Sequence, residues 1–257
     1  MTTKHSTEKP SSETEGFISH LEELRKRVLY SMIFISIAFC FCWNYSTEIF
    51  NVIRKPIAPY LETAGGGLVF TGVMDKFMAH LKVSFLAAII ISCPFWIYQA
   101  WQFVAPGLYT KEKKYGASFI IAGSVLFLGG IFFVYYFVYP TTFEFLMNFG
   151  GDTDKPLITI SDYISFFILT TLMFGLVFEL PLVIVLLGVL GIVDAKFLRA
   201  KRRYAMVILA IIAAIATPTP DALSMAIMFG PLVALYEVSI FFVAWFGKKR
   251  VDVEDAI

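Results

Sequence analysis

Long runs of apolar residues recur six times along the chain and dominate its pattern. A helix needs about 20 predominantly apolar residues to cross a hydrocarbon layer of about 30 Å. The runs lie near 28–45, 83–104, 116–139, 163–189, 204–216 and 222–246. We therefore predict an all-α polytopic membrane protein, with six transmembrane helices in one domain over residues 17–246.

The fifth run is short for a membrane span. Its thirteen residues rise only about 20 Å as a helix, so either the bilayer thins there or protein shields the helix. The segment 217–221, TPTPD, is too short and too rich in proline for anything but a tight hairpin, with Pro220 at the first position of the next helix. Six spans place this hairpin on the outer face.

The segment 44–75 is the longest of the outer loops. It contains the amphipathic stretch STEIFNVIRKP and a run of three glycines, which predicts a structured cap on the outer face. Further along, Pro181 interrupts the fourth apolar run and is expected to kink that helix. The kink favours a concave helix arrangement near this depth.

The composition indicates a membrane protein and argues against nucleic acid as a partner. Of the 257 residues 58% are hydrophobic and 16% are charged, and the mean hydropathy is +0.74, too apolar for a soluble domain to hide in one core. A net charge of +1 offers no general affinity for nucleic acid. The lipid bilayer is therefore the expected environment.

The positions of the basic residues predict the orientation. Sixteen of the 21 lysines and arginines lie in the N-terminal region through residue 27, at 111–114, at 196–203 and at 248–250. The positive-inside rule puts these segments, and with them both termini, in the cytoplasm. Residues 1–16 are polar and lack the features of a secretory signal peptide. We expect a disordered cytoplasmic tail at 1–16 and a second tail at 247–257.

The sequence offers little for catalysis. It contains no HExxH, GxSxG, Walker or GxGxxG pattern in a plausible context, and its three histidines are scattered. The three cysteines fall inside apolar runs without a zinc spacing, which favours a structural role. We predict no enzyme, no catalytic residue, no metal and no cofactor.

Two glutamates lie within the apolar runs. Glu179, in FGLVFELP, either joins helices through a hydrogen bond or faces a wet groove, and the sequence leaves both interpretations open. Glu237, in the last run, has the same status. The pair could form the proton relay of a small-solute secondary transporter, the main alternative function, whereas an intramembrane hydrolase is disfavoured because no nucleophile is evident. Asp221 is expected to cap the last helix.

Acidic residues also accompany the bases at two cytoplasmic boundaries. Ser19 and Glu22 fit a capping box, and the spacing pairs Glu22 with Lys26 and Glu23 with Arg27. The acids would then simply neutralise neighbouring bases of the same helix. Alternatively, Glu23 and the lone acid of PGLYTKEKKY, Glu112, could together grip a doubly basic ligand through bidentate bonds to guanidinium groups.

Five motifs follow one another along the chain, namely HLEELRKR (20–27), RKPIAP with Pro56, FVAPGLYTKEKK (103–114), FGLVFELP (174–181) and TPTPD (217–221). In their order and spacing they resemble the TatC family, the polytopic subunits of the twin-arginine protein translocase. The resemblance implies a receptor that binds the twin-arginine signal peptides of folded precursor proteins and nucleates an oligomeric translocation complex. It further implies small single-span partners, TatA and TatB, the proton-motive force as the energy source, and the bacterial inner (plasma) membrane as the location.

The resemblance also implies roles for individual residues. Glu23 and Glu112 correspond to the acids that bind the arginine pair, while Arg25 and Phe103 belong to the same signal-peptide-binding motifs. Pro56 in the cap, Glu179 in the groove and Asp221 at the outer hairpin match further family positions, and Pro181 belongs to the motif of Glu179. One departure is Met225, which stands where several relatives carry a glutamine, so a polar partner contact is in doubt there.

Overall fold

The computed structural model describes residues 12–63, 66–105, 116–148, 157–216 and 222–246, and these residues are almost entirely helical. An isolated bridge between Val69 and Thr159 is the sole strand-like pairing recorded among them. The all-α prediction is therefore confirmed. In chain order the helices are α1 (Ser12–Asn44), α2 (Ser46–Arg54), α3 (Ala58–Thr63), α4 (Asp75–Ile91), α5 (Cys93–Val104), α6 (Gly116–Phe133), a π-helical turn (Val134–Val138), α7 (Tyr139–Asn148), α8 (Ile160–Val177), α9 (Leu180–Val189), α10 (Ala195–Ala200), α11 (Arg202–Ala216) and α12 (Ala222–Phe246).

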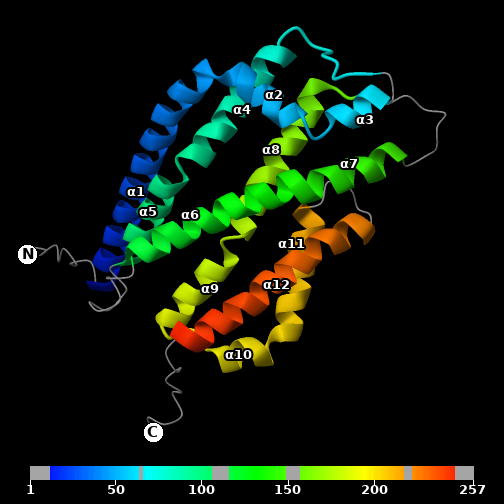
Figure 1. Cartoon of the computed structure of the whole chain (residues 1–257). Helices are drawn as coiled ribbons and strands as arrows, with labels where there is room; N and C mark the ends of the chain where they lie inside the picture. Colours follow the sequence, from blue (N-terminus) through cyan, green and yellow to red (C-terminus); the bar gives the residue numbers. More distant parts are fainter. Residues whose placement is uncertain (1–11, 64–65, 106–115, 149–156, 217–221, 247–257) are drawn as a thin grey trace, which may run out of the picture.

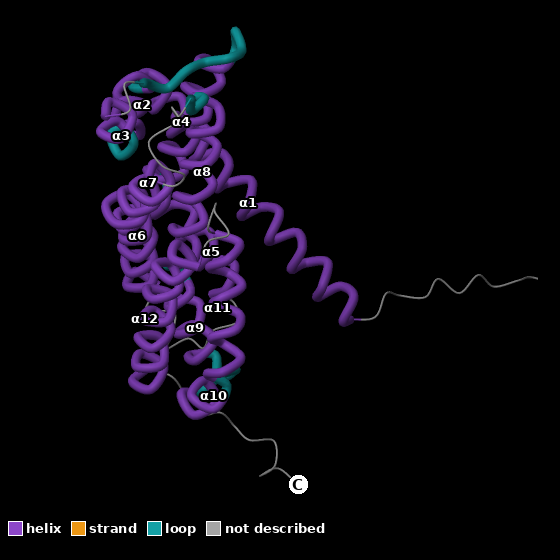
Figure 2. The backbone as a smooth tube through the Cα atoms, turned by 90° about the vertical axis from the view of Figure 1, so that its right-hand side faces the viewer, coloured by secondary structure: helices purple, strands orange, loops and turns teal. Residues whose placement is uncertain are grey.

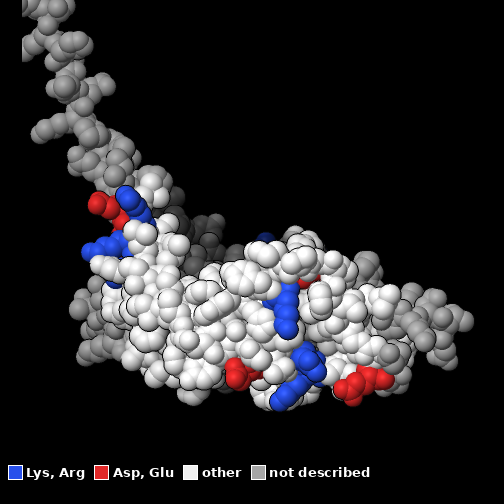
Figure 3. Space-filling model, turned by 90° about the horizontal axis from the view of Figure 1, so that it is seen from above, with Lys and Arg blue, Asp and Glu red and all other residues white. Residues whose placement is uncertain are grey.

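Each of the six predicted apolar runs is helical. Among the described residues, four stretches are long and apolar enough to cross a membrane by themselves, namely His20–Asn44, Gly116–Asn148, Ile160–Val189 and Met228–Trp245. The bent pair α4 and α5 adds a fifth. α11 has 15 residues and rises about 22 Å, so it is short, as predicted. The arrangement is compatible with six spans. Uncharged side chains cover most of the face seen in Figure 3, as expected for a protein surrounded by lipid.

Two of the spans are broken at prolines. α4 and α5 meet at Ser92 with a bend of 57°, and Pro94 lies in the first turn of α5, where it cannot donate to the preceding turn. The second predicted run is therefore not straight, and its helix begins earlier, at Asp75. The break between α8 and α9 lies at Phe178 and Glu179, just before Pro181. The helix is thus interrupted at the position where a kink was predicted, although Ile160–Val189 still forms one candidate span.

α1 begins earlier than the sequence suggests. It starts at Ser12, inside the segment 1–16 predicted to be a disordered tail. Ser19 therefore lies within the helix and cannot be its N-terminal cap, so the predicted capping box is wrong. α1 packs along α4 and α5, and its N-terminal end points away from the body of the molecule (Figure 2).

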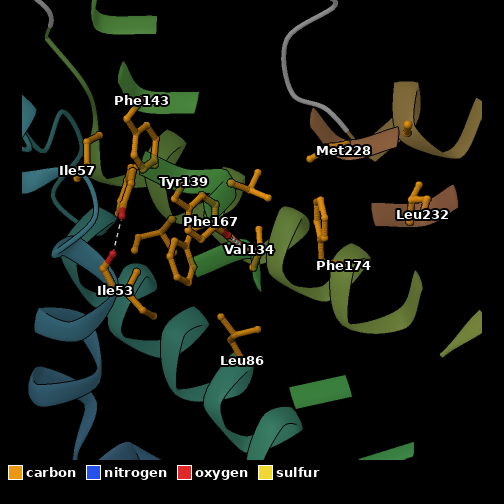
Figure 4. Packing of buried hydrophobic residues seen from close by; sticks show 14 of the residues in the cluster. Ile53, Ile57, Leu86, Val134, Tyr139, Phe143, Phe167, Phe174, Met228 and Leu232 are labelled. Atoms are coloured by element: carbon orange, nitrogen blue, oxygen red, sulfur yellow. Dashed lines mark hydrogen bonds between the residues drawn. The ribbon is translucent and has the colours of Figure 1, made fainter. Parts of the chain in front are cut away.

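α2, α3 and the segment 66–74 form a cap at one end of the molecule (Figure 1). Three tyrosine hydroxyls tie it to the helices beneath. Tyr135 donates to Val52 O at 2.8 Å, Tyr163 to Ile53 O at 2.5 Å, and Tyr60 of the cap donates to Pro140 O at 3.1 Å. Ile53 and Ile57 are buried beside Tyr139, Phe143 and Phe167 (Figure 4). The predicted outer-face cap is thus a packed part of the fold.

Candidate functional site

Glu23 lies on α1, partly buried, and is paired with the next turn of its own helix. Its Oε1 accepts a hydrogen bond from Arg27 Nη2 at 3.2 Å, so the predicted pair of Glu23 and Arg27 is present. Glu22 and Lys26 are exposed, and among the described residues they form no ion pair. The two neighbouring acids therefore have different surroundings. Of the two, only Glu23 forms an ion pair within the described residues.

Arg27 extends this contact to a second helix. Its Nη1 donates to Gln99 Oε1 at 3.4 Å, and Gln99, on α5, is only 6% exposed. This residue was not predicted from the sequence. Its signal was weak but present, since Gln99 is a polar side chain within the apolar stretch CPFWIYQAWQFV.

Phe103, near the C-terminal end of α5, contacts the same motif of α1. Its ring lies 5.9 Å from that of His20 in an edge-on arrangement. Together with the bond from Arg27 to Gln99 and the stacking of Phe34 on Phe95 at 4.8 Å, this contact aligns α1 and α5 as antiparallel neighbours. Arg25 is exposed beside them.

The segment 106–115, which holds Glu112, lies outside the described residues. The helices that flank it are packed together, because the rings of Trp101 on α5 and Phe119 on α6 are 4.6 Å apart. A Cβ atom added to Gly116 would lie 2.6 Å from Trp101 Nε1. The chain therefore leaves α5 and enters α6 at closely spaced points, near the part of α1 that carries Glu23. Asp221 also lies outside the described residues.

Glu179 lies elsewhere, at the break between α8 and α9. Its Oε1 is buried and has no hydrogen-bond partner among the described residues. The other oxygen faces α6, since a Cβ atom added to Gly123 would lie 3.3 Å from it, and Ile97 and Leu182 crowd the same spot. A hydrogen bond joining helices is thus not seen for this carboxyl group within the described chain, and the wet groove stays a prediction.

Glu237 is paired with a base on a neighbouring helix. Its Oε2 accepts from Arg202 Nη2 at 2.5 Å, which joins α12 to α11. This pairing removes the main reason for assigning Glu237 to a proton relay. Met225 is exposed on α12. Pro56 lies half-buried between α2 and α3, in the cap, at the end of the molecule opposite the start of α1 (Figure 1).

The described residues contain no group of three or more His, Cys, Asp or Glu side chains that could hold a metal ion. What the N-terminal part of α1 and the end of α5 do offer is a partly buried carboxylate, an exposed guanidinium at Arg25 and an aromatic ring at Phe103. Of these groups, the carboxylate can accept charge-assisted hydrogen bonds from a basic ligand, and the ring can stack on a guanidinium group.

Comparison with known proteins identifies one family. Residues 19–231 match the family model described as "Sec-independent protein translocase protein (TatC)". A protein of this name from Koribacter versatilis is 37% identical over 227 residues, 88% of this chain and 83% of its own length. One from Carboxydothermus hydrogenoformans is 40% identical over 235 residues, 91% of this chain and 95% of its own. A solved structure described as "Crystal Structure of Twin Arginine Translocase Receptor- TatC" is 30% identical, has a TM-score of 0.76, and covers 88% of this chain and 99% of its own.

Proposed function

Because the chain belongs to the TatC family of multi-pass membrane components of the twin-arginine translocase, we propose that it is the subunit that binds the twin-arginine signal peptides of folded precursor proteins. The resemblance seen in five motifs is confirmed at the level of the family. Support for the receptor role comes from the related crystal structure, whose protein is described as a twin-arginine translocase receptor.

The proposed binding groups are the carboxylates of Glu23 and Glu112. An arginine side chain keeps its charge and presents a planar fork that can bond both oxygens of a carboxylate, whereas a lysine ammonium is a compact point charge. Two carboxylates at a partly desolvated boundary therefore favour an Arg-Arg pair over a Lys-Lys pair. Arg25 and Phe103, which belong to the same two sequence motifs as these acids, are proposed as further members of the binding surface.

The observation that carries this proposal is the antiparallel packing of α1 on α5. Contacts from His20 to Phe103 and from Arg27 to Gln99 bring the turn of Glu23 beside the end of α5. The segment that holds Glu112 starts from this end, and α6, where it finishes, is packed on Trp101. Glu23 thus lies on a helix that packs beside the end of α5, from which the segment holding Glu112 starts.

The remaining proposed features follow from the family and from the charges. The apolar part of the signal peptide lies along the helices near Glu179, and the complex assembles with TatA and TatB in the bacterial inner membrane, driven by the proton-motive force. Both termini are proposed to lie in the cytoplasm, because 16 of the 21 bases fall in segments on that side.

Peptide binding to the purified protein in lipid nanodiscs tests the proposal. A hydrogen bond to a charged group contributes about 1.5 to 3 kcal/mol, so Glu23→Lys and Glu112→Lys should each weaken binding of an Arg-Arg signal peptide by about tenfold to a hundredfold or more. Glu22→Lys, an equal charge change on the adjacent exposed residue, is the matched control and should bind as the unaltered protein does.

The same measurement with a Lys-Lys peptide completes the test. The unaltered protein should bind this peptide much more weakly than the Arg-Arg peptide. Equal loss of binding in the Glu22 and Glu23 variants would mean that overall charge, and not a particular carboxylate, attracts the peptide, and the proposal would then be wrong.

A further inference from the structure

Arg27 bridges two elements of the proposed binding site through different nitrogens. Nη2 donates to Glu23 Oε1 on α1 at 3.2 Å, and Nη1 donates to Gln99 Oε1 on α5 at 3.4 Å. Gln99 is 6% exposed and lies within a helix, so it is the fixed end of this bridge. The position of the Glu23 carboxylate is therefore linked, through Arg27, to α5.

Two groups of this bridge, one on Glu23 and one on Arg27, have no hydrogen-bond partner among the described residues. Arg27 holds Glu23 through a single oxygen, and among the described residues Glu23 Oε2 has no partner. Arg27 Nε is buried and lacks an acceptor within the same part of the chain. A guanidinium free of Gln99 could instead rotate to face the carboxylate with both Nε and Nη2, the bidentate arrangement that arginine favours with carboxylates. That arrangement would occupy both oxygens of Glu23.

We propose that Gln99 is a positioning residue for signal recognition, which holds Arg27 so that Glu23 keeps one oxygen open to an arginine of the incoming peptide. This inference rests on the proposed function and deepens it. Arg27 restrains the carboxylate on the α5 side of α1, next to Phe103 and the start of the segment that contains Glu112. Gln99 prevents Arg27 from acting as an internal substitute for the peptide arginine.

A purely structural role for Gln99 makes the opposite prediction for two substitutions. If Gln99 only fills space between helices, Gln99→Leu keeps most of its volume and should be tolerated, whereas Gln99→Glu adds a charge at a buried position and should be harmful. If Gln99 holds Arg27, Gln99→Glu keeps the acceptor and strengthens the bond to the guanidinium. Gln99→Leu then removes the acceptor and releases Arg27 onto Glu23.

The test measures dissociation constants of Arg-Arg and Lys-Lys signal peptides with the full chain in nanodiscs, along with the thermal unfolding midpoint. We expect Gln99→Leu to weaken binding of the Arg-Arg peptide about tenfold, with little change for the Lys-Lys peptide and with a normal midpoint. Gln99→Glu should bind the Arg-Arg peptide at least as tightly as the unaltered protein. Gln102→Leu is the matched control on the same helix, because Gln102 donates to Tyr98 within α5 at 2.5 Å, and it should change neither affinity.

The outcomes separate the failure of this inference from that of the proposed function. If the unaltered protein binds the Arg-Arg and Lys-Lys peptides equally well, both the proposed function and the role of Gln99 are wrong. If that preference is present and Glu23→Lys removes it, but Gln99→Leu binds normally or Gln99→Glu binds more weakly than Gln99→Leu, the positioning role alone is wrong. Should Gln99→Leu fail to insert, Gln99→Met also replaces the amide acceptor by an apolar side chain of similar length while Arg27 is kept, and it should weaken Arg-Arg binding in the same way.

Discussion

Tyr139 connects the π-helical turn and α7 to α8 through one buried hydroxyl group. Its side chain is fully buried, and its Oη donates to Phe167 O at 2.8 Å and lies 2.7 Å from Thr171 Oγ1. Its ring also stacks on that of Phe167 at 4.5 Å. A buried hydroxyl with both partners satisfied is favourable, whereas removing it leaves polar atoms without a partner.

We therefore expect Tyr139→Phe to lower the free energy of unfolding by about 1 to 2 kcal/mol. The measurement is reversible unfolding in mixed micelles. Tyr136→Phe is the matched control, because Tyr136 is exposed on the next turn toward the N-terminus, and it should leave stability unchanged. Equal stability of the two variants would show that the hydroxyl of Tyr139 contributes nothing to the fold.

At the scale of residues, the sequence predicted one contact within α1 correctly, whereas the predicted pair of Glu22 with Lys26 is not formed among the described residues and the contacts between helices were missed. The pair of Glu23 and Arg27 follows from a spacing of four residues, which places two side chains on one helix face. The contact of Arg27 with Gln99 depends on how α1 packs on α5, and no local pattern encodes that register. The cap at Ser19 was predicted wrongly because a good local signature lay inside a helix that begins at Ser12.

At the scale of elements, close approach of α6 and α8 depends on two glycines. A Cβ atom added to Gly130 would lie 2.7 Å from the backbone oxygen of Phe174, and one added to Gly175 would lie 2.6 Å from the ring of Phe127. Small residues allow helix backbones in a membrane to approach closely, and packing rather than a hydrophobic driving force then holds the helices together.

Gly130→Ala should accordingly reduce stability by about 1 to 3 kcal/mol, because the backbone of α8 must move to admit the methyl group. Gly129→Ala provides the comparison, since a Cβ atom at Gly129 meets nothing within 4 Å and alanine favours the helix by up to about 1 kcal/mol. Unfolding of the two variants in the same micelles measures the difference. A Gly130 variant as stable as the Gly129 variant would contradict the packing described for α6 and α8.

The apolar runs predicted the helices better than they predicted the ends and bends. Every run is helical in the structure, because long apolar segments in lipid must satisfy their backbone groups internally. α4 extends back to Asp75 through a segment, DKFMAHLK, in which half of the residues are polar, so hydropathy alone could not locate its start. The effect of Pro181 was predicted, whereas the bend at Ser92 was missed although Pro94 was visible in the sequence.

At the scale of the whole molecule, the cap and the proposed recognition site lie at opposite ends (Figure 1). α2 and α3 cover one end, and the N-terminal part of α1, the end of α5 and the start of α6 meet at the other. α1 ends where the cap begins, and α5 runs antiparallel to α1, so the end of α5 lies at the end of the molecule opposite the cap. Glu23 and the helix ends on either side of the segment 106–115 therefore lie away from the cap that contains Pro56 (Figure 1).

The candidate site itself could be predicted only with the help of the family. Charge spacing showed that Glu23 and Glu112 accompany bases at two boundaries that are predicted to be cytoplasmic, but pairing with neighbouring bases explained the acids of α1 as well. The choice between these interpretations required the motif order of the TatC family, which the match over residues 19–231 supports. Two carboxylates would select arginine over lysine because the planar guanidinium can bond both oxygens of a carboxylate.

Photo-cross-linking from a precursor protein tests the central claim most directly. A photoreactive residue placed next to the arginine pair of the signal peptide should label receptor fragments that contain residues 20–27 or 103–114, and replacing the pair by Lys-Lys should abolish the labelling. Glu23→Lys should abolish it as well, whereas Glu22→Lys should not. Labelling that maps instead to α11 or α12, or that is equally strong from the Lys-Lys precursor, would contradict recognition of the arginine pair by Glu23 and Glu112.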